Sequence, residues 1–452
     1  MCWIATKNNQ FLSAFSVLSL MVFLLLRGDA STTAKEFPAG LISIQGEDLP
    51  GKYNGAEIGD FAVSPDNTKI AVEFEVGEGD KKLGVWLGEF EIATKKLIAK
   101  VHLTNPVSET ITFIAVHHET MKYSPDGSQI IVQAGRDLYA FDSVTLNLRY
   151  SVSYPDLAEG SASEVYGRRF AISSDGSTLA VFFGQSINPQ RLGLVRLFKA
   201  KTGEQLARWS VSVPIQSLSL SPDGKQLLVT ALNPKDTTDI LLLDSVSGLV
   251  IKGFESGFGT HLLAGAAVNA MFVDADDFVA TPGSFTDEKG RYLGHGLKII
   301  DSRTGKVTRE LTYEKFSPSQ VWVSARDSTL ATLNLWMSPW RRRSMEGSHS
   351  HAQLLFFRLN EGNPFCVLGP IPENKERPRQ SGFIRFSPDL GLMGLFINRK
   401  LTVYSVPECN ERSGTRAVKE QSERAGRSRS RVATMSPQFC KTKRAKVVEG
   451  LT

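Results

Sequence analysis

Short alternating strands that end in a Ser-Pro-Asp-Gly turn, or a close relative of it, recur along the chain. A second apolar strand follows each turn at once. Proline presets φ at the first central turn position, Asp or Ser bonds the local backbone, and glycine accepts a positive φ. Two strands flanking such a turn are predicted to form a hairpin. The seven copies read FAVSPDNTKIAV from Phe61, MKYSPDGSQIIV from Met121, FAISSDGSTLAV from Phe170, LSLSPDGKQLLV from Leu218, MFVDADDFVA from Met271, VWVSARDSTLATL from Val321 and IRFSPDLGLMGL from Ile384.

A second hairpin follows in most copies, made of an apolar strand, a Ser/Thr-Gly or equivalent turn and a more polar strand. Examples are VRLFKAKTGEQLARWSV, ILLLDSVSGLVIKGF and LKIIDSRTGKVTREL. Each copy therefore holds four antiparallel strands. One such sheet cannot cover both of its faces, but sheets stacked around an axis bury each other. The predicted fold class is all-β, a seven-bladed β-propeller. The aligned turn positions are Asp66, Asp126, Asp175, Asp223, Asp276, Arg326 and Asp389.

The two ends of the repeat region complement each other. The seventh copy stops after its third strand, at Leu401 to Pro407, and an orphan strand, Leu41 to Gln45, precedes the first copy. If the orphan strand completes the last blade, the ring closes and an exposed sheet edge disappears. We therefore expect an N-terminal strand to complete the last blade.

These units resemble those of WD-repeat-like propellers, in the divergent bacterial form grouped with YVTN-type and Tol-type propellers. The resemblance covers roughly residues 37–407 and rests on the Ser-Pro-Asp-Gly and Asp-Ser-x-Thr-Gly turns. No unit has the Trp-Asp dipeptide of the eukaryotic-type family. The resemblance implies a binding platform. It does not identify what is bound, because fold alone does not set function.

The N-terminal 30 residues have the parts of a secretory signal: Lys7, an apolar run from Phe11 to Leu26, and a small-residue exit at Gly28 and Ala30. The alternative is an uncleaved anchor, which would be the only membrane attachment. Both interpretations export the body, to the periplasm or outside the cell. We expect three parts: a signal peptide or anchor (1–30), the propeller (31–410) and a basic disordered tail (411–452).

The net charge of +5 belongs to that tail, which holds eleven Lys or Arg and four Glu. Its Ser, Gly and Arg content predicts disorder rather than a nucleic-acid site, and we do not expect a nucleic-acid partner. The four cysteines, Cys2, Cys366, Cys409 and Cys440, show no metal-binding spacing. Whether Cys366 and Cys409 pair stays open, as does the oligomeric state.

Length variation falls on one side of the predicted disk. The turns joining strands one to two and three to four stay short, whereas the other connections open on the opposite face and swell. Long loops on a rigid scaffold are where binding groups concentrate. We therefore predict a loop-rich face. Its longer connections are Val76 to Leu83, Asn105 to Glu119, Gly184 to Arg191, Asn233 to Asp239, Ser256 to Ala267, Thr281 to Gly294, Trp336 to Ala352 and Pro372 to Gln380.

Two of these loops, from adjacent blades, form the predicted partner-binding patch. Trp, Tyr and Arg dominate interface energetics, and arginines suit an anionic peptide or sugar acid. The alternative is that these residues have no binding role: the arginines are solvated at the surface, and the tryptophans pack the loop onto the blade. The patch residues are Trp336, Trp340, Arg341, Arg342, Arg343, His349 and His351 from the first loop and Arg291 and Tyr292 from the second.

Catalytic chemistry is sparse in the sequence. No Gly-x-Ser-x-Gly elbow or phosphate loop occurs, and His349 and His351 lack an apparent third ligand. We expect no catalytic residues, metal or cofactor. The favoured function is non-enzymatic binding of a protein or peptide. The alternative is a propeller enzyme, a quinoprotein-like dehydrogenase or a lyase, that uses the central channel.

Overall fold

The structure is a computed structural model of the whole chain. It describes Lys35, 38–49, 56–78, 81–103, 119–134, 137–153, 168–187, 190–211, 215–232, 238–254, 270–280, 285–286, 292–294, 296–313, 318–324, 326–336, 351–369, Ile371, 383–397 and 399–407. The chain divides into two units, Met1–Pro407 and Glu408–Thr452, and all described residues belong to the first.

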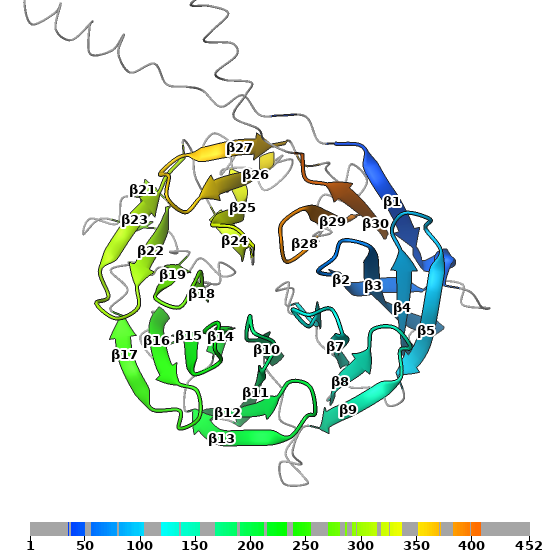
Figure 1. Ribbon diagram of the computed structural model, residues 1–452, viewed down its shortest axis with the longest axis horizontal. Coiled ribbons are helices and arrows are strands. Elements are labelled where there is room, and N and C mark those ends of the chain that lie inside the picture. Colours follow the sequence, from blue (N-terminus) through cyan, green and yellow to red (C-terminus); the bar gives the residue numbers. More distant parts are fainter. Residues whose placement is uncertain are drawn as a thin grey trace, which may run out of the picture. The chain divides into compact units, whose positions relative to one another are not determined.

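Seven four-stranded antiparallel sheets form a ring, as Figure 1 shows, so the predicted seven-bladed β-propeller is confirmed. Within the described residues the one helix is η1 (Gly46–Asp48), which is far too short to cross a membrane. Blade one is β2 (Glu57–Val63), β3 (Lys69–Glu78), β4 (Lys81–Glu91) and β5 (Leu97–Leu103). Blade two is β6 (Met121–Tyr123), β7 (Gln129–Ala134), β8 (Asp137–Asp142) and β9 (Leu148–Ser153). Blade three is β10 (Arg168–Ile172), β11 (Thr178–Ile187), β12 (Gln190–Lys199) and β13 (Gln205–Val211).

The remaining blades follow the same order, with a small hairpin inserted in the fifth. Blade four is β14 (Ile215–Leu220), β15 (Gln226–Leu232), β16 (Thr238–Asp244) and β17 (Val250–Phe254). Blade five is β18 (Ala270–Phe272), β19 (Asp277–Ala280), β22 (Leu297–Asp301) and β23 (Val307–Leu311), with the hairpin β20 (Phe285–Thr286) and β21 (Tyr292–Gly294). Blade six is β24 (Pro318–Val323), β25 (Thr329–Trp336), β26 (His351–Arg358) and β27 (Pro364–Leu368). Blade seven is β28 (Phe383–Phe386), β29 (Leu392–Ile397), β30 (Lys400–Ser405) and β1 (Gly40–Gln45).

The fourth strand of blade seven comes from the start of the described chain. β1 pairs antiparallel with β30, with Ser43 opposite Thr402 and Ile44 opposite Leu401. Ile42 and Ile44 are buried in the apolar cluster between blades seven and one. Burial of that size contributes roughly 2 kcal/mol per side chain. That this pairing is what holds the ring closed stays a prediction, and a crosslinking test of it closes the Discussion.

The core lies between the blades rather than within any one of them. Each apolar cluster takes buried residues from two neighbouring sheets: for example, Phe170, Leu179 and Phe198 of blade three pack with Ile131 and Leu138 of blade two. A single blade would expose these faces, so each sheet depends on its neighbours.

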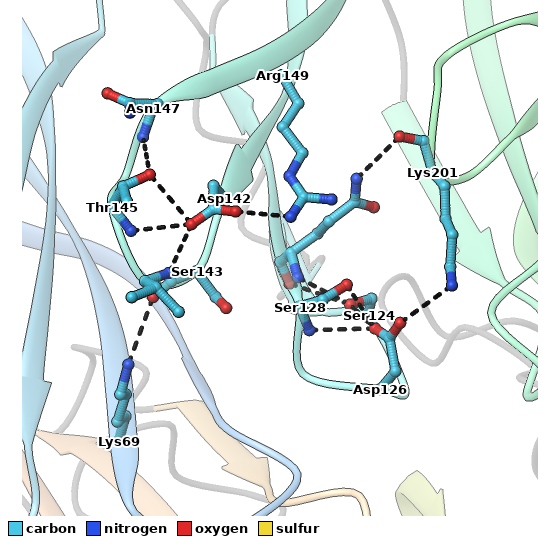
Figure 2. A network of polar contacts seen from close by, with 12 residues as sticks. Lys69, Ser124, Asp126, Ser128, Asp142, Ser143, Thr145, Asn147, Arg149 and Lys201 are labelled. Carbon is cyan, nitrogen blue, oxygen red and sulfur yellow. Dashed lines mark hydrogen bonds and ion pairs between the residues drawn. The ribbon is translucent and has the colours of Figure 1, made fainter.

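The first turn has the predicted Ser–Asp chemistry in five of the seven blades: one, two, three, four and seven. In blade two, the Ser124 hydroxyl donates to Asp126 at 2.7 Å and accepts from the Gln129 amide at 2.9 Å, and Gly127 has φ +70°. Ser64–Asp66, Ser173–Asp175, Ser221–Asp223 and Ser387–Asp389 repeat the first contact at 2.6 to 2.8 Å. Partial burial opposes the effect, but hydrogen bonds from Ser124 and Ser128 lower the pKa of Asp126 to about 2. Figure 2 shows this turn beside the second turn, where Asp142 accepts from Thr145 and pairs with Arg149.

Side chains of the outer strands connect consecutive blades. The Trp209 indole of β13 donates to the Ser245 carbonyl of blade four at 3.0 Å. Its ring also packs over Gly248, which has φ +71°. A Cβ at this position would overlap the Trp209 ring, so only glycine fits there. Analogous donors reach the second turn of the next blade in three further places: Tyr150 to Ala200, Lys252 to Arg303 and Arg309 to Leu359.

Candidate functional site

The connections between strands differ sharply between the two faces of the ring. On one face, the turns joining strands one to two and three to four are short in every blade. On the other face, β25 and β26 are separated by the residues between Trp336 and His351, and β17 and β18 by those between Phe254 and Ala270. The longer connections therefore leave from the face opposite the short turns, and two of the predicted loops are corrected. Val76 to Leu83 and Gly184 to Arg191 are mostly strand, because β3–β4 and β11–β12 extend almost to their tips.

The structure places part of the predicted patch at the loop-rich end of blade six. Trp336 is the last residue of β25, and its backbone pairs with His351, the first residue of β26. The two ends of this loop are therefore held together by the sheet. Trp340, Arg341, Arg342, Arg343 and His349 lie outside the described residues.

The second predicted loop leaves the same face of the neighbouring blade. It lies between β19 and β22, and its hairpin pairs Tyr292 with Thr286. Arg291 lies outside the described residues. The backbone thus puts the roots of both loops on adjacent blades, five and six, and the meeting of their side chains stays a prediction.

A buried ionic cluster that the sequence did not reveal joins the inner strands of neighbouring blades, and these strands line the centre of the ring in Figure 1. Asp60 of β2 in blade one pairs with Arg385 of β28 in blade seven, with 3.2 Å between Oδ1 and Nε. Both side chains are almost fully buried. Burial raises the pKa of Asp60, while Arg385 and the amides of Thr120 and Phe61 oppose the rise.

Blade two joins the same cluster through Thr120, which precedes β6. The Thr120 amide donates to Asp60 Oδ2 at 2.6 Å, and its hydroxyl lies 3.0 Å from Asp60 and 3.2 Å from Glu73. Glu119 forms an ion pair with Lys122 at 2.6 Å. Burial works against ionisation of Glu119, but Lys122 and Arg385 lower its pKa. Blades seven, one and two are therefore tied together by polar contacts between their inner strands.

Among the described residues, no group of three or more His, Cys, Asp or Glu side chains is arranged to hold a metal ion. Lys122 also lies over the Phe170 ring of blade three at 5.9 Å, and burial lowers the pKa of Arg169 in β10 to about 10. Charged side chains of blades seven, one, two and three thus lie on the inner strands of neighbouring blades. Sequence reasoning missed this cluster because its members come from four different repeats, and within any one repeat each looks like an ordinary strand residue.

Comparison with known proteins shows the fold alone. No known protein family matches this chain, and no curated protein does. Among solved structures, a chain in the crystal structure of the mitotic checkpoint complex matches with 12% identity and a TM-score of 0.50, covering 83% of this chain and 98% of that one. The β-propeller domain of Cps50 (Swd1) from Myceliophteria thermophila matches with 10% identity and a TM-score of 0.47, covering 82% and 100%. These structural neighbours are WD40-type β-propellers.

Proposed function

We propose that this chain is a non-enzymatic, extracytoplasmic β-propeller that binds a protein or peptide through its loop-rich face. The observation that supports it is the asymmetry of the ring. Short turns of nearly constant length close one face, while the connections of variable length, including the two Trp/Arg/Tyr-bearing loops of blades five and six, leave from the other. A rigid frame with variable loops on one face suits recognition.

The proposed partner surface has the composition of an interface. Trp336, Trp340 and Tyr292 offer large rigid area, and Arg341 to Arg343 together with Arg291 offer planar donors for carboxylates. His349 and His351 complete the patch. The partner chemistry that fits is a peptide segment with acidic residues. The similar chain from the mitotic checkpoint complex belongs to a protein assembly, which is compatible with a scaffold role.

Export is the second part of the proposal, and one described residue supports it. Cys366 on β27 is disulfide-bonded, and its partner cysteine lies outside the described residues. Disulfides persist in oxidising compartments outside the cytoplasm. With the apolar run from Phe11 to Leu26, this favours a periplasmic or secreted body, and it is compatible with the bacterial YVTN/Tol-type affiliation.

The test is capture of a partner by the full chain. The double variant Trp336→Ala/Trp340→Ala should abolish capture, and Arg341→Ala/Arg342→Ala/Arg343→Ala should weaken it and reduce its salt dependence. The matched control is Arg303→Ala/Lys306→Ala, which removes exposed cations from a second turn on the opposite face. Capture that survives the double tryptophan variant would overturn the assignment of the patch.

A further inference from the structure

Because the seven blades can be aligned in register, a residue that differs in type from its equivalents in the other blades is easily found. One such exception is a buried carboxylate. Glu89 of β4 pairs with Ala71 in the middle of the sheet and has 0% exposure. At the same register position, every other blade has a buried apolar residue. Those residues are Ala140, Leu197, Leu242, Ile299, Phe356 and Val403.

Two further exceptions contact Glu89 directly. The Tyr123 hydroxyl donates to Glu89 Oε1 at 2.9 Å, and Lys69 Nζ lies 3.3 Å from Oε2. Tyr123 stands just before the first turn, where blades one, three, four, six and seven have Val63, Ile172, Leu220, Val323 and Phe386. Lys69 opens the second strand, where the other blades have Gln129, Thr178, Gln226, Asp277, Thr329 and Leu392.

The fourth exception is Arg326, which occupies the turn position that holds Asp in the other six blades. Its guanidinium reaches across blade seven, donating to Asp389 at 3.0 Å and to the Pro65 carbonyl of blade one at 3.3 Å. The Arg326 side chain is still 66% exposed. It therefore keeps donors that can face a bound molecule.

These four exceptions line one cavity on the face of the short turns, opposite the loop-rich face. The cavity has a volume of about 340 Å³ and lies between blades one and two, with Asp66 and Asp126 also in its wall. Figure 2 shows Lys69 reaching the Ser143 carbonyl of blade two. A volume of this size is within the range of small-molecule sites.

The electrostatics of the cavity are costly for the fold. Burial raises the pKa of Glu89, although Tyr123 and Lys69 oppose the rise. Replacing a buried ion pair by apolar residues is often neutral or stabilising, and six blades already use the apolar solution. A repeat that departs from its own rule at four positions around one cavity has the signature of a functional site.

The wall carries both signs of charge. Lys69 and Arg326 supply cationic donors. Asp66 and Asp126 supply carboxylates whose pKa lies below its ordinary value, since hydrogen bonds from Ser64 and Ser124 outweigh partial burial. We propose that this cavity binds a small zwitterion, an α-amino acid, with its carboxylate toward Lys69 and Arg326 and its ammonium group toward Asp66 and Asp126. The site is separate from the loop-rich face and does not depend on the proposed partner.

The test is calorimetric titration of the full chain with a panel of the common L-amino acids, each compared with its matched amine and carboxylate; for alanine these are ethylamine and propionate. At least one amino acid should bind, and its matched amine and its matched carboxylate, the two half-ligands, should each bind at least tenfold more weakly. Absence of binding across the panel, or equal binding of a half-ligand, would overturn the proposal.

A second test uses variants in which the exceptional residues are replaced by the residue types found at the same positions of other blades. Glu89→Leu/Tyr123→Leu introduces residues that blades three and four already use, and Arg326→Asp restores the common turn. Each should weaken amino-acid binding at least tenfold, while the melting temperature of Glu89→Leu/Tyr123→Leu stays equal or rises. Asp223→Asn, at the equivalent turn of blade four, should bind as the wild type does. Wild-type binding by Arg326→Asp would contradict the assignment even if the double variant fails to fold.

Discussion

Arg385 Nε of the last blade lies 3.2 Å from Asp60 Oδ1 of the first blade, and both side chains are buried. The two residues are far apart in sequence, and the contact exists only when the ring is complete. A second contact crosses the same seam at the short turns, where the Asn67 amide donates to Asp389 at 2.8 Å. The seam between blades seven and one is therefore held by two polar contacts and by an apolar cluster.

Replacing Arg385 with methionine should lower the free energy of unfolding by about 3–5 kcal/mol at neutral pH, because the buried charge of Asp60 loses the cation that neutralises it. Burial already raises the pKa of Asp60, and Arg385 opposes that rise, so the folded-state pKa climbs further in the variant. A raised carboxyl pKa means that stability falls as pH rises from about 4 through the folded-state value. Urea unfolding at acidic and at neutral pH measures the loss in free energy of unfolding of the variant relative to the wild type. This loss should be larger at neutral pH.

The control for this variant is Arg399→Met. Arg399 also joins blade seven to blade one, through Glu57 at 2.7 Å, but both side chains are more than half exposed. An exposed pair contributes about 0–1 kcal/mol, so this variant should be close to wild type. Equal losses for the two variants would show that burial of the Asp60 pair has no special weight.

Asp126→Ala should cost about 1–2 kcal/mol near neutral pH, because the turn loses the acceptor for Ser124 and Ser128. The pKa of Asp126 is lowered to about 2 in the folded state, so its contribution is present above the unfolded value of about 4 and is lost as pH falls toward 2. Thermal unfolding across that range should show the wild type and the variant converging in acid. A constant difference down to the lowest pH would contradict the assigned role.

Gly248→Ala should destabilise the ring by more than about 1 kcal/mol, since a Cβ there overlaps the Trp209 ring and the backbone has φ +71°. Gly253→Ala is the matched control, because its Cβ would meet only a Leu241 methyl at 3.7 Å. Trp209→Ala/Gly248→Ala should lose less than the sum of the single losses, because the overlap is then gone. Denaturant unfolding of the four proteins measures this coupling, and strict additivity would argue against the contact.

The outer strand of blade four is an aggregation liability. Leu249, Val250 and Ile251 at the start of β17 are 70%, 58% and 52% exposed. In blade six, by contrast, the apolar strand β27 is largely buried, and Lys35 bonds to its outer edge through Val367 and Gly369. Val250→Lys/Ile251→Lys should therefore reduce concentration-dependent self-association without lowering the melting temperature. Light scattering over a concentration series would reveal a variant that associates as the wild type does, and this would show that the edge is inert.

The sequence predicted the architecture well because each blade repeats a local rule. The Ser-Pro-Asp-Gly turns, their Asp contacts and the number of blades follow from chemistry within a few residues, which the alternating pattern exposes. The two connections that were expected to be long loops, at β3–β4 and β11–β12, instead continue as paired strands almost to their tips.

The sites were harder to predict because they join different repeats. Asp60 and Arg385 meet only through ring closure, and nothing near either residue in sequence indicates a partner. Glu89 and Arg326 carried a usable signal: an alignment of the seven units in register shows a carboxylate in an apolar column and an arginine in an aspartate column. Of the predicted patch, the described residues settle only the backbone positions of Trp336, His351 and Tyr292.

The closure of the ring by β1 is the central claim, and a crosslink between Ser43 and Thr402 tests it most directly. These residues oppose each other in register, whereas Leu401 pairs with Ile44. In oxidised full-length protein, Ser43→Cys/Thr402→Cys should yield a disulfide-linked peptide pair in mass spectrometry and a higher melting temperature, and Ser43→Cys/Leu401→Cys should yield neither. Absence of the first crosslink, or equal yields from both variants, would contradict the closed ring.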